Sequence, residues 1–464
     1  MAGRRLGFLL VAILLLAIEP TFVGDTAPVA GPLRVSDQNS RYFATPAGQP
    51  ILLTGSHTWQ NFQDTGEGDS PPRFDYSAYL TFLRRNNHNF FRLWVWEQAR
   101  WSNEIDDDDY VYTPSPYQRA GPGTAVDGQP KFNLDRFDPA YFARLRDRVR
   151  QAGQQGVYVS VMLFDGWSIQ ACKGDVCLRN PWNGHPFNKD NNVNGVDGDP
   201  NGDGSGEETQ TLAVPAVTAR QEAYVRKVID TVGDLDNVLY EITNEGPSDS
   251  VSWQYHMINY IKSYESAQGK EHHPVGMTAA YPGGDNAALV ASPADWISPN
   301  GDMNNPQVNT GTKVVLSDTD HLCGVCADSS WPWKSFTRGQ NPIYMDAYDG
   351  AYGIGGHMDD PAAVSVRANL GYVLAYSRRM NLAAVTPQPD LSSTGYCLAG
   401  GGEYLVFSPG GTFTVNLTGM SRLYGQWLDP NTGRTASARS VTGARSVEFT
   451  APFDGPAVLY LKSS

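Results

Sequence analysis

Two carboxylates stand at the end of an apolar segment near the middle of the chain. Residues 237–247 read NVLYEITNEGP, where a run typical of a buried strand carries Glu241 and Glu245. An unpaired carboxylate inside a protein costs several kcal/mol, so each group must be paired or take part in chemistry. A second polar group, SDTDH at 317–321, follows another apolar run.

Such carboxyl groups could hydrolyse a glycosidic bond with retention of configuration. That reaction uses two carboxyl groups about 5 Å apart, one protonated as general acid and one ionised as nucleophile. Glu245 is the candidate acid, and Asp318 or Asp320 the candidate nucleophile. His57 and His321 could instead join the two aspartates around a metal, so a metal-dependent hydrolase is an alternative.

The elements that must position these groups alternate along the chain. Runs rich in β-branched and aromatic residues predict strands at 50–59, 89–97, 157–166, 237–245, 274–281, 294–300, 313–321 and 341–348. Apolar residues three and four apart predict helices at 74–86, 138–153, 214–232, 252–268 and 360–381. Eight such repeats predict an α/β fold, a (β/α)8 TIM barrel over residues 31–388, with function at the C-terminal ends of the strands.

Polar residues gather at those predicted strand ends. Besides the candidates above, the expected substrate-binding residues are His57, Trp59, Arg92, Glu97, Asp165, Asn244, His321 and Asp346. The chain also holds 11 Trp, 23 Tyr and 18 Phe, and the tryptophans near the mouth could stack on sugar rings. Both features predict a site for an oligosaccharide or polysaccharide.

After residue 391 the sequence changes to short alternating runs separated by Gly and Pro. This pattern predicts a small antiparallel β-sandwich domain over 391–464. The junction PQPD at 387–390 is too short for free movement, so we expect the domain to pack on the barrel.

The N-terminus predicts export. Arg4 and Arg5 precede an apolar run at 6–18 that is short for a membrane span, so residues 1–24 are interpreted as a signal peptide and the mature protein as secreted. No other stretch is long and apolar enough to cross a membrane. The net charge of −14 argues against nucleic acid as a partner.

Five cysteines fit an oxidising compartment. We predict local disulfides Cys172–Cys177 and Cys323–Cys326 at the active-site face, with Cys397 as a buried thiol. A redox or zinc role for the second pair is the alternative, but no other close Cys or His pair accompanies it.

The insertion at 167–213 contains DGDPNGDGSGEE. Its oxygen-bearing side chains have the spacing of a calcium loop, which makes a structural calcium site an expectation, against the alternative of a solvated turn. The candidate ligands are Asp197, Asp199, Asn201, Asp203 and Glu208. We expect no cofactor to be required for the chemistry itself.

The strand motifs resemble a known group of enzymes. YEITNEGP (240–247) and NFFRLWVWE (89–97) are similar to the fourth and second strands of the clan of retaining (β/α)8 glycoside hydrolases that includes many cellulases. The resemblance implies that Glu245 is the acid/base, that Asn244 contacts the substrate and that Arg92 supports the nucleophile. The clan places a Glu nucleophile on strand seven, where this chain has Asp318 and Asp320. Asp346 on strand eight is a third candidate for the nucleophile, and strand position favours Asp318.

A narrower resemblance covers nearly the whole mature chain. LLTGSHTWQNFQD (52–64), SDTDHL (317–322), PIYMDAY (342–348) and GQWLDPNTG (425–433) resemble the apiosidase-like glycoside hydrolases, whose tail domain is often labelled collagen-binding. This implies a secreted glycosidase acting on a plant or microbial polysaccharide. The alternative is a non-catalytic carbohydrate- or collagen-binding protein on a barrel scaffold.

Overall fold

The structure is a computed structural model that describes residues 29, 31–101, 109–173, 179–348, 358–443 and 446–463. The predicted signal peptide at 1–24 lies outside these residues. Among the helices of the described residues, none is long and apolar enough to cross a membrane.

Eight parallel strands form a barrel. In chain order they are β4 (Gly55–His57), β6 (Phe90–Leu93), β10 (Tyr158–Asp165), β11 (Val238–Asn244), β12 (Val275–Thr278), β13 (Trp296–Ser298), β14 (Val314–Asp318) and β15 (Asn341–Met345). Neighbours in sequence are neighbours in the sheet, and β15 pairs with β4. Between β4 and β6 the ring is closed by the amide of Asn89, which donates to the carbonyl of Thr54 at 3.0 Å. The predicted (β/α)8 barrel is confirmed.

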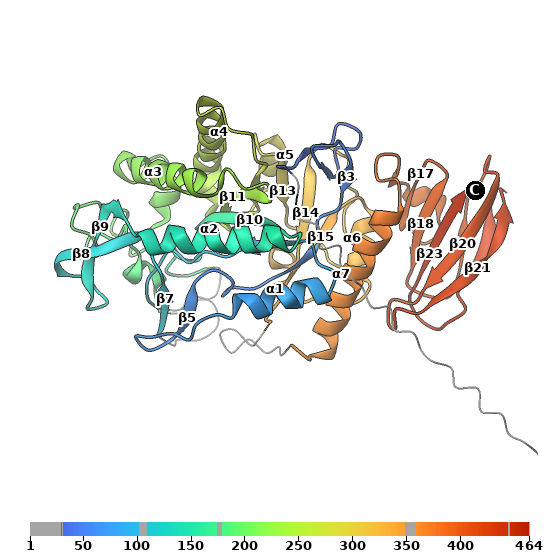
Figure 1. The fold of residues 1–464 in the computed structure, drawn as a ribbon, viewed down its shortest axis with the longest axis horizontal. Coiled ribbons are helices and arrows are strands. Elements are labelled where there is room, and N and C mark those ends of the chain that lie inside the picture. Colours follow the sequence, from blue (N-terminus) through green and yellow to red (C-terminus); the bar gives the residue numbers. More distant parts are fainter. Residues whose placement is uncertain are drawn as a thin grey trace, which may run out of the picture.

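Helices surround the strands (Figure 1). They are α1 (Tyr76–Arg85), α2 (Pro139–Gln154), α3 (Pro215–Val232), α4 (Val251–Ala267), α5 (Asn286–Ala291), α6 (Trp331–Thr337) and α7 (Pro361–Arg379). Asp75, Asp138 and Asp360 cap α1, α2 and α7 by accepting a hydrogen bond from a first-turn amide. Proline follows the cap in α2 and α7, where its missing N–H costs nothing.

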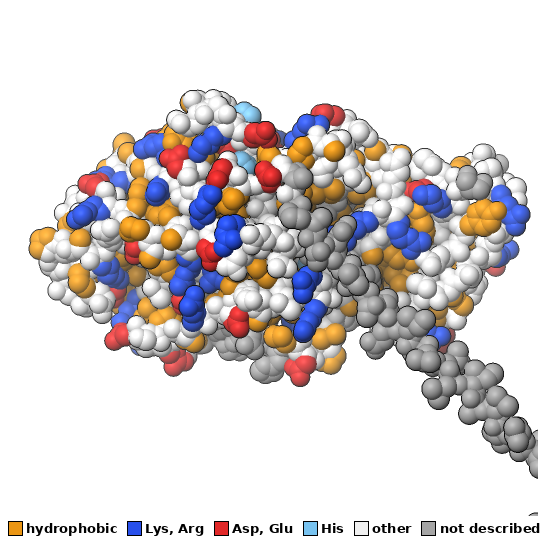
Figure 2. Space-filling view, viewed as in Figure 1, with side chains coloured by type: hydrophobic (Ala, Val, Ile, Leu, Met, Phe, Trp, Pro, Cys, Tyr) orange, Lys and Arg blue, Asp and Glu red, His pale blue; other side chains and the backbone are white. Residues whose placement is uncertain are grey.

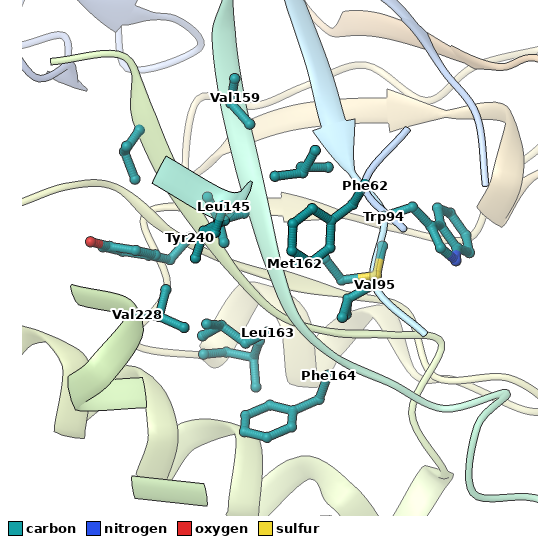
Figure 3. Close-up of a cluster of buried hydrophobic side chains, with 14 of the residues drawn as sticks. Phe62, Trp94, Val95, Leu145, Val159, Met162, Leu163, Phe164, Val228 and Tyr240 are labelled. Carbon is teal, nitrogen blue, oxygen red and sulfur yellow. The ribbon is translucent and has the colours of Figure 1, made fainter. Parts of the chain in front are cut away.

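The main core lies between the helices and the strands. Figure 3 shows Leu145 of α2 and Val228 of α3 beside Val159 and Leu163 of β10 and Tyr240 of β11, all of them buried. Every residue of β10 and β11 is buried, as expected for parallel strands covered on both faces.

Smaller antiparallel pairs extend the barrel. A three-stranded sheet near the N-terminus contains β1 (Arg34–Val35), β2 (Phe43–Ala44) and β3 (Pro50–Ile51). β5 (Asp64–Glu67), which follows β4, pairs with β7 (Tyr110–Thr113), which follows β6. Between β7 and α2, β8 (Tyr117–Thr124) pairs with β9 (Pro130–Phe137).

The C-terminal part is a two-sheet antiparallel structure. One sheet has the order β16 (Thr386–Pro387), β17 (Cys397–Gly400), β18 (Glu403–Ser408), β23 (Ala457–Ser463), β20 (Arg422–Leu428) and β21 (Thr435–Thr442). The other pairs β19 (Thr412–Val415) with β22 (Val447–Thr450). The first strand, β16, already belongs to this sheet before residue 391.

The tail packs against α6 and α7 at one end of the molecule (Figure 1). Side chains of β18 alternate, so Leu405 and Phe407 face the helices while Val406 faces the second sheet of the tail. At the same junction, Asn369 of α7 donates to the Pro430 carbonyl at 2.9 Å. This shared core leaves the tail no freedom to move as a tethered unit.

The cysteines partly match the expectations. Cys323 and Cys326 form a disulfide, and Cys397 is a buried free thiol whose pKa burial raises to about 12. The Cys172–Cys177 pairing falls on Cys177, which lies outside the described residues, so it stays a prediction.

Candidate active site

Arg92 connects the candidate catalytic strands. From β6, its Nε and Nη2 donate to the Glu241 carboxylate on β11 at 3.0 and 2.5 Å. Nη2 also donates to Asn244 Oδ1 at 2.6 Å, and Nη1 donates to Asp318 and to Asp320, each at 2.9 Å. Glu241 is therefore a paired carboxylate inside a buried network.

The charges of this network compensate one another through buried ion pairs. Arg92 is 1% exposed, and burial alone would lower its pKa, but Glu241 and Asp318 outweigh that effect and raise the pKa well above its usual value. A buried cation that lost these partners would be strongly destabilising. The network thus fixes the position of each carboxylate it contacts.

Asp318 is the last residue of β14 and is fully buried. His57 Nε2 lies 3.0 Å from Asp318 Oδ1, and the His57 ring is stacked on Trp94. Burial would raise the pKa of Asp318, but His57 and Arg92 outweigh it and hold the pKa well below its usual range. Asp318 is therefore an ionised carboxylate at neutral pH, enclosed by its partners.

Asp320 lies in a different environment. The expectation that strand seven continues through residue 321 is wrong, because the strand ends at Asp318 and Thr319–His321 form a 3-10 turn. Asp318 caps this turn by accepting from the amide of Asp320 at 3.1 Å. The turn brings the Asp320 side chain out of the strand register to the barrel mouth, while Arg92 still holds one of its oxygens.

Glu245 follows β11 in a left-handed backbone conformation, with φ at 43°. This conformation is uncommon for a residue with a side chain and often accompanies function. Gly166 allows the turn, because a Cβ at that position would lie 2.2 Å from the Glu245 carbonyl oxygen.

The Glu245 carboxyl group has two polar neighbours from the insertion after β10. Trp167 Nε1 donates to Oε2 at 2.5 Å, and Lys173 Nζ lies 4.0 Å from the same oxygen while donating to the Glu245 backbone carbonyl. Burial and then Asp320 raise the pKa of Glu245 to about 8, against the opposing effects of Lys173 and Trp167. Glu245 can therefore hold a proton at neutral pH.

His321 completes this side of the site as a neutral ring. Its Nδ1 lies 2.7 Å from Ser298 Oγ, and its Nε2 lies 3.3 Å from Asn244 Oδ1 and 3.5 Å from Asp320. Burial, opposed by Asp320, lowers the pKa of His321.

A cavity of about 590 Å³ lies over these groups at the barrel mouth. Four of the expected site residues line it: Trp59, Glu245, Asp320 and His321. Trp167 and Tyr281 also line it, with their rings stacked at 6.4 Å and an interplanar angle of 13°. The cavity combines a protonated acid, a carboxylate and aromatic faces.

Six expected substrate-binding residues lie outside this lining. His57, Arg92 and Asn244 belong to the network described above, and the other three have partners elsewhere. Asp346 forms a buried ion pair with Arg367 of α7 at 2.5 Å. Asp165 accepts from the Ser168 hydroxyl at 2.8 Å, and Glu97 accepts from the Asp165 amide at 2.8 Å. In these positions they support strands and loops.

Sequence reasoning missed Lys173, Tyr281 and Asn300. Tyr281 and Asn300 line the cavity, and Lys173 is buried beside Glu245. Tyr281 and Asn300 end predicted strands, and that position could have identified them. Lys173 lies in a long insertion, where no motif indicates that the loop folds back over the mouth.

The structure gives the calcium loop no additional support. Asp199 Oδ1 accepts from the amides of Gly202 and Asp203 at 2.8 and 3.2 Å, and Asn201 donates to Glu208. Within the described ranges, no group of three or more His, Cys, Asp or Glu residues could hold a metal ion. The calcium site stays a prediction.

Comparison with known proteins gives the fold. No protein-family model matches the sequence, and no curated protein matches it. Among solved structures, a protein described as a glycoside hydrolase is similar with a TM-score of 0.58 and 12% identity, covering 94% of this chain and 97% of that one. A glycoside hydrolase family 5 protein from Bacteroides vulgatus is similar with a TM-score of 0.60 and 12% identity, covering 93% and 94%.

This chain shares the fold of these glycoside hydrolases. The similarity covers the tail as well as the barrel, because it extends over nearly the whole of both chains. At this level of identity it shows the architecture, and the chemistry must be argued from the site.

Proposed function

We propose that the protein is a retaining glycoside hydrolase with Glu245 as acid/base and Asp320 as nucleophile. The observation that carries this proposal is that both carboxyl groups line one cavity in different surroundings. Burial raises the pKa of Glu245 to about 8, while Asp320 accepts a hydrogen bond from Arg92 at 2.9 Å. Two carboxyl groups in different environments are what acid and nucleophile roles require.

The reaction has two steps. Asp320 attacks the anomeric carbon while Glu245 gives its proton to the departing glycosidic oxygen, which leaves a glycosyl ester on Asp320. Glu245, now ionised, then takes a proton from a water molecule whose oxygen attacks the same carbon and releases Asp320. Two inversions at one carbon give net retention.

Strand position in the sequence favours Asp318 as the nucleophile, whereas this proposal assigns that role to Asp320. Asp318 is fully buried, holds His57 and Arg92, and lies outside the cavity lining. Asp320 is in the lining. We therefore propose that Asp318 is a positioning residue that orients Arg92 and the turn bearing Asp320.

Asn244 has the features of a substrate contact. Its Oδ1 accepts from Arg92, and its Nδ2 is buried with no hydrogen-bond partner among the described residues. A buried donor without a partner is costly. Asn244 is fully buried and lies outside the cavity lining, so the proposed contact with a sugar hydroxyl requires the side chains that cover it to move aside. The Trp167 and Tyr281 rings offer flat faces on which a sugar could stack.

The substrate is proposed to be a plant or microbial polysaccharide or its oligosaccharides, reached by a secreted enzyme. The predicted signal peptide supports export, and the sequence resemblance to apiosidase-like hydrolases supports a furanoside among the substrates to be tried. The tail is proposed to support the barrel, because its apolar residues pack on α6 and α7.

The test is a set of aryl glycosides, furanosides included, offered to the wild type and to Glu245→Gln, Asp320→Asn and Asp318→Asn. We expect Asp320→Asn to be inactive and to regain turnover with azide, which replaces the missing nucleophile. Asp390→Asn, at an exposed aspartate of the tail, is the matched control. Azide rescue of Asp318→Asn alone, or an inverted product anomer, would overturn the assignment.

Two further outcomes identify the alternatives. A metal-dependent hydrolase using Asp318, Asp320 and His321 would lose activity with a chelator, but the Arg92 guanidinium already lies between the two aspartates. If the protein only binds carbohydrate, the Glu245→Gln variant would still bind the ligand, and the wild type would show no turnover.

A further inference from the structure

A second cavity, of about 410 Å³, lies beside the start of α1 and the middle of α2. It shares no lining residue with the cavity at the barrel mouth. Three arginines line it: Arg73, Arg144 and Arg148. Figure 2 shows Lys and Arg side chains over the face where α1 and α2 lie side by side in Figure 1.

Arg148 is a buried cation without an anion. It is 6% exposed, and its Nε is buried with no hydrogen-bond partner. Its guanidinium lies over two aromatic rings, with Cζ 4.4 Å from the centroid of Tyr76 and 5.7 Å from that of Phe74. Within the described part of the chain, it forms no ion pair.

The neighbouring charges do not supply the missing partner. Arg144 is paired with Asp64 at 2.8 Å, and Arg73 is exposed and has no ion pair among the described residues. The two acids in the lining are engaged elsewhere, since Asp75 caps α1 and Asp147 accepts from Arg150 and Gln151. Burial, together with Arg144 and Arg73, lowers the pKa of Arg148 to about 10.

We propose that this cavity binds an oxyanion, with Arg148 as its buried anchor and Arg73 as its exposed one. A guanidinium presents its donors in a fork that matches two oxygens of a sulfate, phosphate or carboxylate. An anion there would pair a buried charge that otherwise has only cation–π contacts, which are weaker. The cavity is open to solvent, so the anion can be free or can be an acid group attached to a sugar chain.

The two sources predict different uses of the site. A free inorganic anion would act as a structural ligand that stabilises the α1–α2 pair. A sulfated or uronic acid residue would anchor an acidic polysaccharide on the side of the barrel, away from the catalytic cavity. Both depend on the same arginines.

The experiment measures anion binding by calorimetry and by melting temperature at constant ionic strength. Sodium sulfate and a uronic acid oligosaccharide are compared with sodium chloride, using wild type, Arg148→Met, Arg73→Met and Arg85→Met. Arg85 is an exposed arginine at the end of α1, outside the cavity lining, and is the matched control. Arg73 is exposed, so its variant keeps the test valid if Arg148→Met fails to fold.

We expect saturable binding to wild type and to Arg85→Met, with affinity at least tenfold weaker in Arg73→Met and Arg148→Met. Turnover of a small aryl glycoside should be the same in wild type and Arg73→Met. Sulfate binding alone assigns the site to a free anion, and tighter binding of the uronate assigns it to an acidic polysaccharide. Absence of saturable binding to wild type, or equal binding by all four proteins, would overturn the proposal.

Discussion

Replacing Lys173 by methionine is expected to move the pH dependence of turnover. Glu245 must be protonated to act as the acid, so activity falls as pH rises through its pKa of about 8. Lys173 is buried, and its charge favours the ionised form of Glu245. Removing that charge raises the pKa of Glu245, and the alkaline limb of the profile should move to higher pH.

The size of the shift follows from the separation of the two charges. Lys173 Nζ lies 4.0 Å from Glu245 Oε2. At that separation two charges interact by about 1 kcal/mol in water and about 4 kcal/mol at an effective dielectric constant of 20. One pKa unit corresponds to about 1.4 kcal/mol, so the limits are about 0.7 and 3 units. Glu245 borders an open cavity, and we expect about 1 to 2 units.

The assay is kcat/KM against pH, which reports the free enzyme, on the most reactive aryl glycoside. Lys173→Arg is the control, because it keeps the charge and should leave the limb within about half a unit. Melting curves show whether each variant is folded. The prediction is refuted if the alkaline limb of folded Lys173→Met stays in place or moves to lower pH. Glu245 would then not be the acid whose pKa Lys173 lowers.

Other predictions follow from packing and charge. Glu241→Gln should lower the free energy of unfolding by about 3–5 kcal/mol, because it removes a negative charge that pairs with the buried Arg92. Denaturant titration measures this change, and a loss under about 1 kcal/mol would contradict the prediction. Replacing Cys323 and Cys326 by serine should lower the free energy of unfolding by up to about 2 kcal/mol, because the loop that the disulfide closes is short. The same change should raise KM, because Cys323 lines the cavity. An unchanged KM would argue against a role of the disulfide in shaping the site. Phe407→Ala should cost about 3–5 kcal/mol and leave one calorimetric transition, since barrel and tail share a core; two separate transitions in the wild type would show that they unfold independently.

The barrel could be predicted because its strands are buried on both faces. A parallel strand covered by helices is apolar throughout and ends in polar residues at the barrel mouth, and both features are visible in the sequence. All eight predicted strands are present. The hairpin of β8 and β9 was not predicted, because its strands are largely exposed and contain Gly and Pro.

The site was predictable in its residue types and less so in its geometry. Arg92, Glu241 and Asn244 lie together because their strands are neighbours or nearly so in a barrel. The roles of Asp318 and Asp320 depend on where β14 stops, and strand ends are the least certain part of a sequence prediction. Asp346 was predicted to bind substrate because it ends a strand, and only the fold shows that Arg367 of α7 reaches it.

The Arg92 network has a consequence for how the enzyme matures. Arg92 forms hydrogen bonds with Glu241, which is 149 positions away in the sequence, and with Asp318, which is 226 positions away. Contacts so distant in sequence form late, because the chain must first close long loops. A partly folded chain would therefore carry Asp320, the proposed nucleophile, without the cation that orients it. If export requires the chain to cross a membrane unfolded, hydrolytic activity would begin only after the barrel has closed on the far side.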